Sequence, residues 1–193
     1  MNPVSIEKQK LKNDRTEMTI EIHRQKLEKL ALEKHNEERR SGFMVWDKLN
    51  EIQIEKLENE TPCDGVKELI KEYFNIKYDD IIKTKIATDL FFYSYAFCKD
   101  RAFNSKCTST FMSIMYEIFI KDSTTTKLSN NMNSSSEYFK SLLLKHSVER
   151  PPSSIKIFTD NDVLPIMTFV IERYYFYIYY YYIYILYYYY YII

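Results

Sequence analysis

The segment DDIIKTKIATDLFFYSYAFCKD, residues 79–100, indicates the fold of this chain more strongly than any other. Apolar side chains recur in it at helical spacing along one face, namely Ile82, Ile86, Leu90, Tyr93 and Phe97. Further apolar side chains lie on its other faces, namely Ile81, Phe91, Phe92, Tyr95, Ala96 and Cys98. A helix that is apolar on nearly all sides is typical of the middle of a bundle. The segment therefore predicts the central helix of an all-α domain.

Similar patterns on either side of this segment predict an irregular bundle of about five helices. Thr61 can cap a preceding helix that has Pro62 in its first turn. The apolar face of that helix consists of Val66, Leu69, Ile70, Tyr73 and Phe74. Asn104 or Ser105 can cap the following helix. Its buried stripe consists of Cys107, Phe111, Ile114, Met115 and Ile118. Only two glycines occur in 193 residues, which also favours helices and excludes a glycine-rich phosphate loop.

The C-terminal half continues the helical pattern after a polar interruption. Residues 121–136 are rich in Ser, Thr, Asn and Lys, and they predict a long, mobile polar loop. Ser134 and Glu137 form a capping box that would start a short helix. Thr159 and Asp162 form a second capping box, which predicts the start of the last helix.

Residues 1–42 differ in composition from the rest and predict a separate, partly exposed helix. They are dominated by Lys, Glu, Arg, Gln and Leu, which suits a solvated helix with ion pairs between neighbouring turns. Ser41-Gly42 ends this helix, and the apolar cluster around Trp46 that comes next is assigned to the core. The predicted organisation is thus a charged helix in residues 1–42 and a helical domain in residues 43–173.

Residues 145–158, KHSVERPPSSIKIF, form a connector between two predicted helices. Each proline fixes its own φ and keeps the preceding residue out of the helical region, so the preceding helix must stop here. One interpretation is a structured connector whose apolar side chains pack on the core. The other is a partner-docking surface built on that connector. The candidate contact residues are Arg150, Pro151, Pro152, Ile155 and Phe158.

The tail, residues 174–193, contains only Tyr, Ile, Phe and Leu. Codons made of A and T alone can encode every one of these residues. We therefore interpret this low-complexity Tyr/Ile tail as a translated repeat, an artefact of the gene model. The alternatives are a real apolar tail and a membrane span, because about 20 residues without a charge are long enough to cross a bilayer. Against a span, Tyr is typical of membrane interfaces rather than of the bilayer centre.

The charges and reactive side chains predict no catalytic, cofactor or metal site. The 27 basic and 27 acidic residues balance, so no electrostatic attraction to nucleic acid or to a membrane is expected. The three cysteines are too widely spaced for a metal pair or a disulfide framework, and His23 and His35 lie far from them. Asp79 and Asp80 are interpreted as helix-capping residues. His146 is interpreted as a cation at the negative end of a helix.

Several short motifs come one after another in a recognisable order between residues 44 and 175. In chain order they are Met44-Val45-Trp46, Asp89-Leu90-Phe91, Ala96-Phe97-Cys98, Phe103, Tyr138-Phe139 and the stretch from His146 to Phe158 with Arg150-Pro151-Pro152. This order resembles the small coiled-coil-domain proteins of the cilia- and flagella-associated protein 119 family. The Arg-Pro-Pro and Phe-Cys segments are the specific parts of the resemblance.

The resemblance implies a non-enzymatic structural subunit of the axoneme of motile cilia and sperm flagella, in the cytoplasm and cytoskeleton. It implies a place in a central-pair projection, with a large scaffold protein, small helical subunits and a calmodulin-containing complex as partners. Family members continue past the last helix with aromatic residues interleaved with Lys and Arg, whereas here the Tyr/Ile run comes after Arg173. The alternative function is a cytosolic helical adaptor unrelated to cilia.

Overall fold

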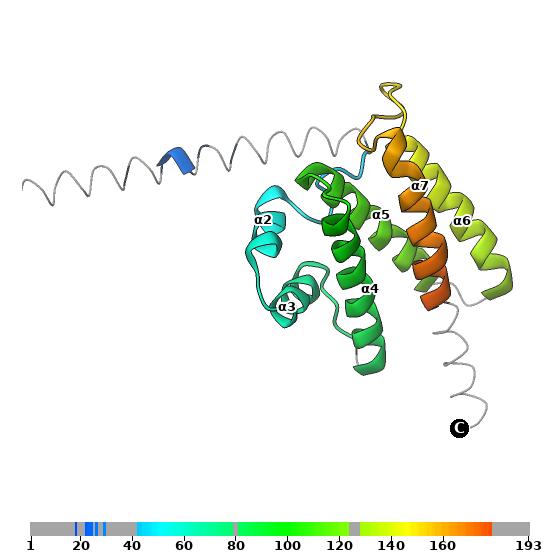
Figure 1. Cartoon of the computed structure of the whole chain (residues 1–193), viewed down its shortest axis with the longest axis horizontal. Helices are drawn as coiled ribbons and strands as arrows, with labels where there is room; N and C mark the ends of the chain where they lie inside the picture. Colours follow the sequence, from blue (N-terminus) through cyan, green and yellow to red (C-terminus); the bar gives the residue numbers. More distant parts are fainter. Residues whose placement is uncertain are drawn as a thin grey trace, which may run out of the picture. The chain divides into compact units, whose positions relative to one another are not determined.

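The structure, a computed structural model, describes residues 42–78, 81–123 and 128–178, together with six helical positions nearer the N-terminus. The chain divides into two compact units, Met1–Ser41 and Gly42–Ile193, and the second contains a bundle of helices. These are α2 (Glu51–Asn59), α3 (Cys63–Tyr73), α4 (Ile81–Asp100), α5 (Ser105–Ser123), α6 (Leu128–Lys145) and α7 (Asp160–Phe169), continued by the π-helical turn η1 (Val170–Tyr175) (Figure 1). The described ranges contain helices and no strand, so the prediction of an all-α fold is confirmed.

The centre of the bundle is α5, which packs against α2, α4 and α6. Twelve of its 19 residues are buried, against seven of the 20 residues of α4. The expectation that the helix of residues 79–100 is central is therefore wrong. That helix instead leaves apolar side chains at the surface, and Ile81 is 83% exposed and Tyr93 52% exposed.

Hydroxyl groups explain how a helix as polar as α5 can occupy the core. The Thr110 hydroxyl donates to the Lys106 carbonyl at 2.8 Å, and the Ser113 hydroxyl donates to the Ser109 carbonyl at 2.8 Å. A Ser or Thr side chain that bonds to the preceding turn of its own helix is satisfied without water. The buried surface of α5 therefore includes positions whose residue types suggest exposure.

The starts of three helices test the capping predictions. The Asn104 side chain accepts a hydrogen bond from the Cys107 amide at 2.8 Å, so Asn104 caps α5 as predicted. Thr159 and Asp162 form the predicted capping box of α7, with the Thr159 amide donating to the Asp162 carboxylate at 2.9 Å. The prediction for α3 is wrong by one position, because Pro62 itself is the N-cap residue and no side chain caps the helix.

The polar loop expected at residues 121–136 is largely helical instead. Helix α5 continues to Ser123, and α6 begins at Leu128, so Ser134 and Glu137 lie inside α6 rather than at its start. Residues 124–127 lie outside the described residues. A contact between α5 and α6 favours helix over the loop that the polar composition predicts: the Ser135 hydroxyl donates to the buried carboxylate of Asp122 at 2.8 Å.

The last helix runs through η1 and past the expected domain boundary at residue 173. Tyr174, Tyr175 and Ile178 are buried in the core cluster. The Tyr174 hydroxyl donates to the Asp122 carboxylate at 2.7 Å. The boundary at residue 173 is therefore wrong as far as Ile178, because these side chains complete the core. The rest of the Tyr/Ile tail, residues 179–193, lies outside the described residues.

Other expectations also concern residues outside the described ranges. They are those for most of the charged helix of residues 1–42, for His35, and for the pair Asp79 and Asp80. None of the helices in the described ranges is long and apolar enough to cross a membrane.

Candidate partner-binding site

The connector between α6 and α7 begins at a buried histidine. The His146 Nε2 atom accepts a hydrogen bond from the Met44 amide at 3.1 Å. Its Nδ1 atom lies 2.8 Å from the Leu142 carbonyl oxygen and therefore donates to it. A ring that accepts at one nitrogen and donates at the other is neutral, and burial lowers the pKa of His146. The interpretation of His146 as a cation is therefore wrong.

Backbone hydrogen bonds close the base of the connector. The His146 carbonyl oxygen accepts from the Ile157 amide at 2.8 Å and from the Phe158 amide at 3.0 Å. The Lys145 carbonyl oxygen accepts from the Ile155 amide at 3.0 Å. Phe158 is 0% exposed, and its ring lies 6.2 Å from that of Phe103 between centroids. The two ends of the connector are therefore tied to each other and to the core.

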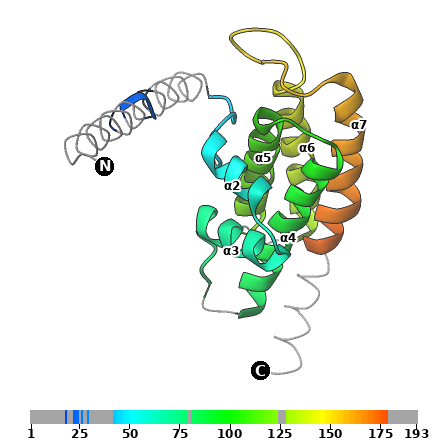
Figure 2. The same ribbon diagram turned by 60° about the vertical axis from the view of Figure 1, so that its left-hand side comes forward.

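The tip of the connector, residues 148–153, is exposed (Figure 2). The Arg150 carbonyl accepts from the Ser154 amide at 3.0 Å, and the Arg150 amide donates back to the Ser154 carbonyl at 3.1 Å. This reciprocal pair holds Pro151 and Pro152 in a tight turn at the surface. Below the turn, the Glu149 carboxylate accepts from the Lys156 amide at 2.8 Å. The tip is therefore an ordered projection rather than an open loop.

The structure separates the five predicted contact residues into two groups. Arg150, Pro151 and Pro152 lie together on the exposed tip. Ile155 is half-buried and Phe158 is fully buried, so both support the tip from the base. A charged fork beside two prolines suits the binding of a protein surface. Among the residues that the structure describes, no cluster of His, Cys, Asp or Glu could hold a metal ion.

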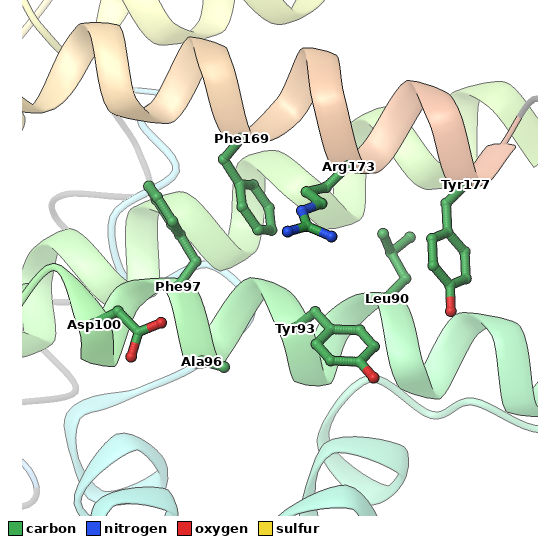
Figure 3. A pocket seen from close by; sticks show the side chains of 8 residues that line it. All are labelled: Leu90, Tyr93, Ala96, Phe97, Asp100, Phe169, Arg173 and Tyr177. Atoms are coloured by element: carbon green, nitrogen blue, oxygen red, sulfur yellow. The ribbon is translucent and has the colours of Figure 1, made fainter.

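A second surface was not predicted from the sequence, namely a groove between α4 and the α7–η1 helix (Figure 3). Its volume is about 480 Å³, and its lining residues are Leu90, Tyr93, Ala96, Phe97, Asp100, Phe169, Arg173 and Tyr177. Two stacked rings, Phe97 and Phe169, join its walls with centroids 4.5 Å apart. The two helices run antiparallel along it, with Leu90 opposite Tyr177 and Phe97 opposite Phe169.

The lining residues do carry a sequence signal. On α4 the groove residues include Tyr93, Ala96 and Asp100, and on the last helix they are Phe169, Arg173 and Tyr177. Each set repeats at helical spacing, so each marks one stripe of a helix. Sequence reasoning missed the groove because it assigned the α4 stripe to the core. It also ended the domain at residue 173.

A buried polar cluster holds the last helix against α5 and α6. The Asp122 carboxylate accepts from the hydroxyls of Tyr174 and Ser135, and the Ser135 and Tyr175 hydroxyl oxygens are 3.2 Å apart. Burial raises the pKa of Asp122, and burial raises the pKa of Tyr175 to about 12. The cluster fixes the position of η1, which contributes Arg173 to one wall of the groove.

One comparison with known protein families gives a match. Residues 93–191 match the model of the CLAMP family, which is described as flagellar C1a complex subunit C1a-32. The match covers just over half of the 193 residues. It begins within α4 and includes α5, α6, the connector, α7 and η1. Both candidate surfaces therefore lie largely within the matched region.

Proposed function

Because the chain belongs to the CLAMP family of flagellar C1a complex subunits, we propose that it is a non-enzymatic structural subunit of a central-pair projection. The family places the protein in the axoneme of the cilium or flagellum, in the central apparatus. Two features support a structural role: the family is one of complex subunits, and the candidate sites are an exposed tip and a surface groove.

We infer that, among such proteins, the chain is of the same kind as cilia- and flagella-associated protein 119. The support is the motif order, above all Arg150-Pro151-Pro152 and Phe97-Cys98. On this inference the partners are a large central-pair scaffold and other small helical subunits, in a complex that contains calmodulin. A cytosolic adaptor is the contrasting function, and it would not stay with axonemes after detergent extraction.

The observation that carries the proposal is the anchored, exposed tip of the connector. Backbone bonds and the buried Phe158 hold its base, so the tip is ordered before any partner arrives. Little conformational entropy is then lost on binding. Arg150 offers a planar fork of donors, and Arg is enriched among residues that dominate interface energies. We propose that Arg150, Pro151 and Pro152 contact a neighbouring axonemal protein.

The test replaces Arg150 in the full chain, expressed in ciliated cells that lack the endogenous protein. Arg150→Ala should leave the melting temperature unchanged, because the side chain is exposed, and should release the protein from detergent-extracted axonemes. Lys140→Ala is the matched control, because Lys140 is an exposed cation on α6 away from the connector. Phe158→Ala should unfold the domain, at a cost of roughly 3–5 kcal/mol.

Two outcomes would contradict the proposal at different levels. If the Arg150 variant stays in the axoneme as the Lys140 variant does, the tip is not the contact. If the unmodified protein is itself washed out by detergent, the structural-subunit function fails and the adaptor function is favoured.

A further inference from the structure

We propose that the groove between α4 and the α7–η1 helix binds one amphipathic helix of another protein, with a carboxylate of that helix placed on Arg173. The proposal rests on the proposed function, since it names the chemistry of a partner for a subunit of a complex. It concerns a surface distinct from the connector tip.

The shape of the groove fits a helix. Two antiparallel helices leave a furrow between their outer stripes, and a third helix can lay its side chains into such a furrow. Here the floor is apolar, formed by Leu90, Ala96 and the stacked pair Phe97 and Phe169. An apolar floor of this kind requires an apolar stripe on the occupant.

The rim of the groove has the composition of an interface. Tyr93 is 52% exposed and Tyr177 is 38% exposed, and their rings stand on opposite walls (Figure 3). Tyr and Arg are enriched at the interface positions where replacement by alanine weakens binding most. Two exposed tyrosines that flank an arginine can therefore cover a partner's apolar side chains with their rings, while the tyrosine hydroxyls remain hydrogen-bonded.

The charges of the groove define the polar part of the occupant. The Arg173 guanidinium lies between Phe169 and Tyr177 and points toward α4 (Figure 3). Among the described residues, no ion pair joins Arg173 or Asp100 to a neighbour. A carboxylate on the incoming helix would complement Arg173 through two parallel hydrogen bonds.

Asp100, the second charged residue of the groove, indicates where the partner helix should carry a cation. Asp100 lies seven residues along α4 from Tyr93, which stands opposite Arg173. Seven residues correspond to about 10 Å along a helix. The occupant that fits best therefore carries Asp or Glu beside its apolar stripe and Lys or Arg about two turns away.

The first experiment identifies what lies in the groove. A photoreactive phenylalanine analogue replaces Tyr93 in the full chain, in cells that assemble cilia, and the crosslinked peptides are sequenced from isolated axonemes. The expected product is a peptide of another protein with apolar residues at helical spacing and an acidic residue within one turn of the crosslink. The same analogue at Lys85, an exposed position of α4 outside the groove, is the control and should not give this product.

The second experiment tests the charge. Arg173→Glu should lower the yield of the Tyr93 crosslink at least tenfold, whereas Lys85→Glu, with the same change of charge, should not. Changing the partner's acidic residue to Lys should restore the yield with Arg173→Glu. If circular dichroism shows that Arg173→Glu melts earlier than the parent chain, Arg173→Gln replaces it and should lower the yield in the same direction.

Each contrary result overturns the proposal. Crosslinks to a second copy of this chain, to peptides without helical apolar spacing, or to nothing at all exclude a partner helix. An unchanged yield with both Arg173 variants excludes the carboxylate contact. Retention in the axoneme is measured in the same preparations, so a protein that is retained without a groove crosslink refutes this proposal and leaves the structural-subunit function standing.

Discussion

His146 joins two segments that are far apart in the chain. Its ring accepts a hydrogen bond from the Met44 amide at one nitrogen and donates one to the Leu142 carbonyl oxygen from the other. The Phe43 ring meets it edge-on, with centroids 6.0 Å apart. One neutral imidazole thus ties the entry of the domain to the end of α6, directly beneath the connector.

Acidification should therefore destabilise the domain through His146. The pKa of His146 is lowered from 6.5 in the folded state, so between the two values the unfolded state binds more protons. Stability must then fall as the pH drops below about 6.5. Urea unfolding at pH 7.5 and pH 5.5 should give a lower free energy of unfolding at pH 5.5, and His146→Gln should shrink this difference.

The variant comparison isolates the histidine from other buried groups. Asp122 acts in the opposite sense, because burial raises its pKa and its folded form binds protons more readily. His23→Gln, in the N-terminal unit, is the matched control and should keep the full pH difference. A His146→Gln variant with an undiminished difference would show that another group is responsible.

At the scale of the element, two serine hydroxyls of α5 form hydrogen bonds with the backbone of the chain segment that precedes α2. The Ser109 hydroxyl accepts from the Trp46 amide at 3.0 Å and donates to the Leu49 carbonyl at 2.7 Å. The Ser113 hydroxyl accepts from the Lys48 amide at 3.2 Å. The irregular segment before α2 is therefore held by hydroxyls of the central helix.

Ser109→Ala should destabilise the domain although it removes one small polar side chain. The change leaves a buried carbonyl and a partly buried amide without this partner, at a cost of about 1–3 kcal/mol. Ser141→Ala is the control, because the exposed Ser141 hydroxyl only bonds to a carbonyl of its own helix, and its effect should stay within about 0.5 kcal/mol. Equal chemical-denaturation midpoints for the two variants would contradict the role assigned to Ser109.

Local signals predicted much of the secondary structure, and contacts between distant elements account for the errors. The box of Thr159 and Asp162 needs only four consecutive residues, so the start of α7 was predictable. The helical structure of residues 121–123 and 128–136 is accompanied by a contact of Asp122 with Ser135 and Tyr174, which no local pattern reveals. The central position of α5 was hidden because buried and exposed hydroxyls look alike in a sequence.

The candidate sites differ in the same way. The connector was predictable because two adjacent prolines interrupt a helical pattern within one short segment. The groove was not, since its walls come from helices far apart in the chain and each wall by itself reads as an ordinary helix stripe. For Phe158, the sequence left burial and exposure open as alternatives, and only the contacts at the base of the connector decide for burial.

On the scale of the whole molecule, the core closes only with residues beyond the expected boundary. Tyr174 is 0% exposed, and Tyr175 and Ile178 are buried beside it. The Tyr174 hydroxyl donates to the Asp122 carboxylate of α5, and the Tyr175 hydroxyl oxygen lies 3.2 Å from that of Ser135 in α6. The folded unit of this flagellar protein therefore extends into the aromatic run.

A chain that ends at Arg173 should be less stable than one that ends at Ile178. The shorter chain loses two buried tyrosines and a buried isoleucine, and removal of one large core side chain alone costs roughly 3–5 kcal/mol. Thermal melts followed by circular dichroism compare the two chains directly. Equal melting temperatures would show that the aromatic residues after Arg173 are dispensable for folding.

The tyrosine hydroxyl alone can be tested in the full chain. Tyr174→Phe keeps the ring but removes a donor to the buried Asp122 carboxylate, so the free energy of unfolding should fall by about 1–3 kcal/mol. Tyr177→Phe removes an exposed hydroxyl from the same helix and should change it by less than about 0.5 kcal/mol. Similar losses in both variants would argue against the buried cluster as an anchor.

The π-helical turn η1 changes the direction in which the side chains after it point around the helix axis. An α-helix turns about 100° per residue, so positions four apart drift by about 40° at each step around its circumference. Yet Ile166, Val170, Tyr174 and Ile178, each four apart, are all buried, while Phe169, Arg173 and Tyr177 all line the groove. A wider turn absorbs part of this drift and keeps both stripes straight. If the same residues formed a regular α-helix instead, Arg173 would lie about 40° and Tyr177 about 80° around the helix from Phe169, and both would turn away from the wall they share with it.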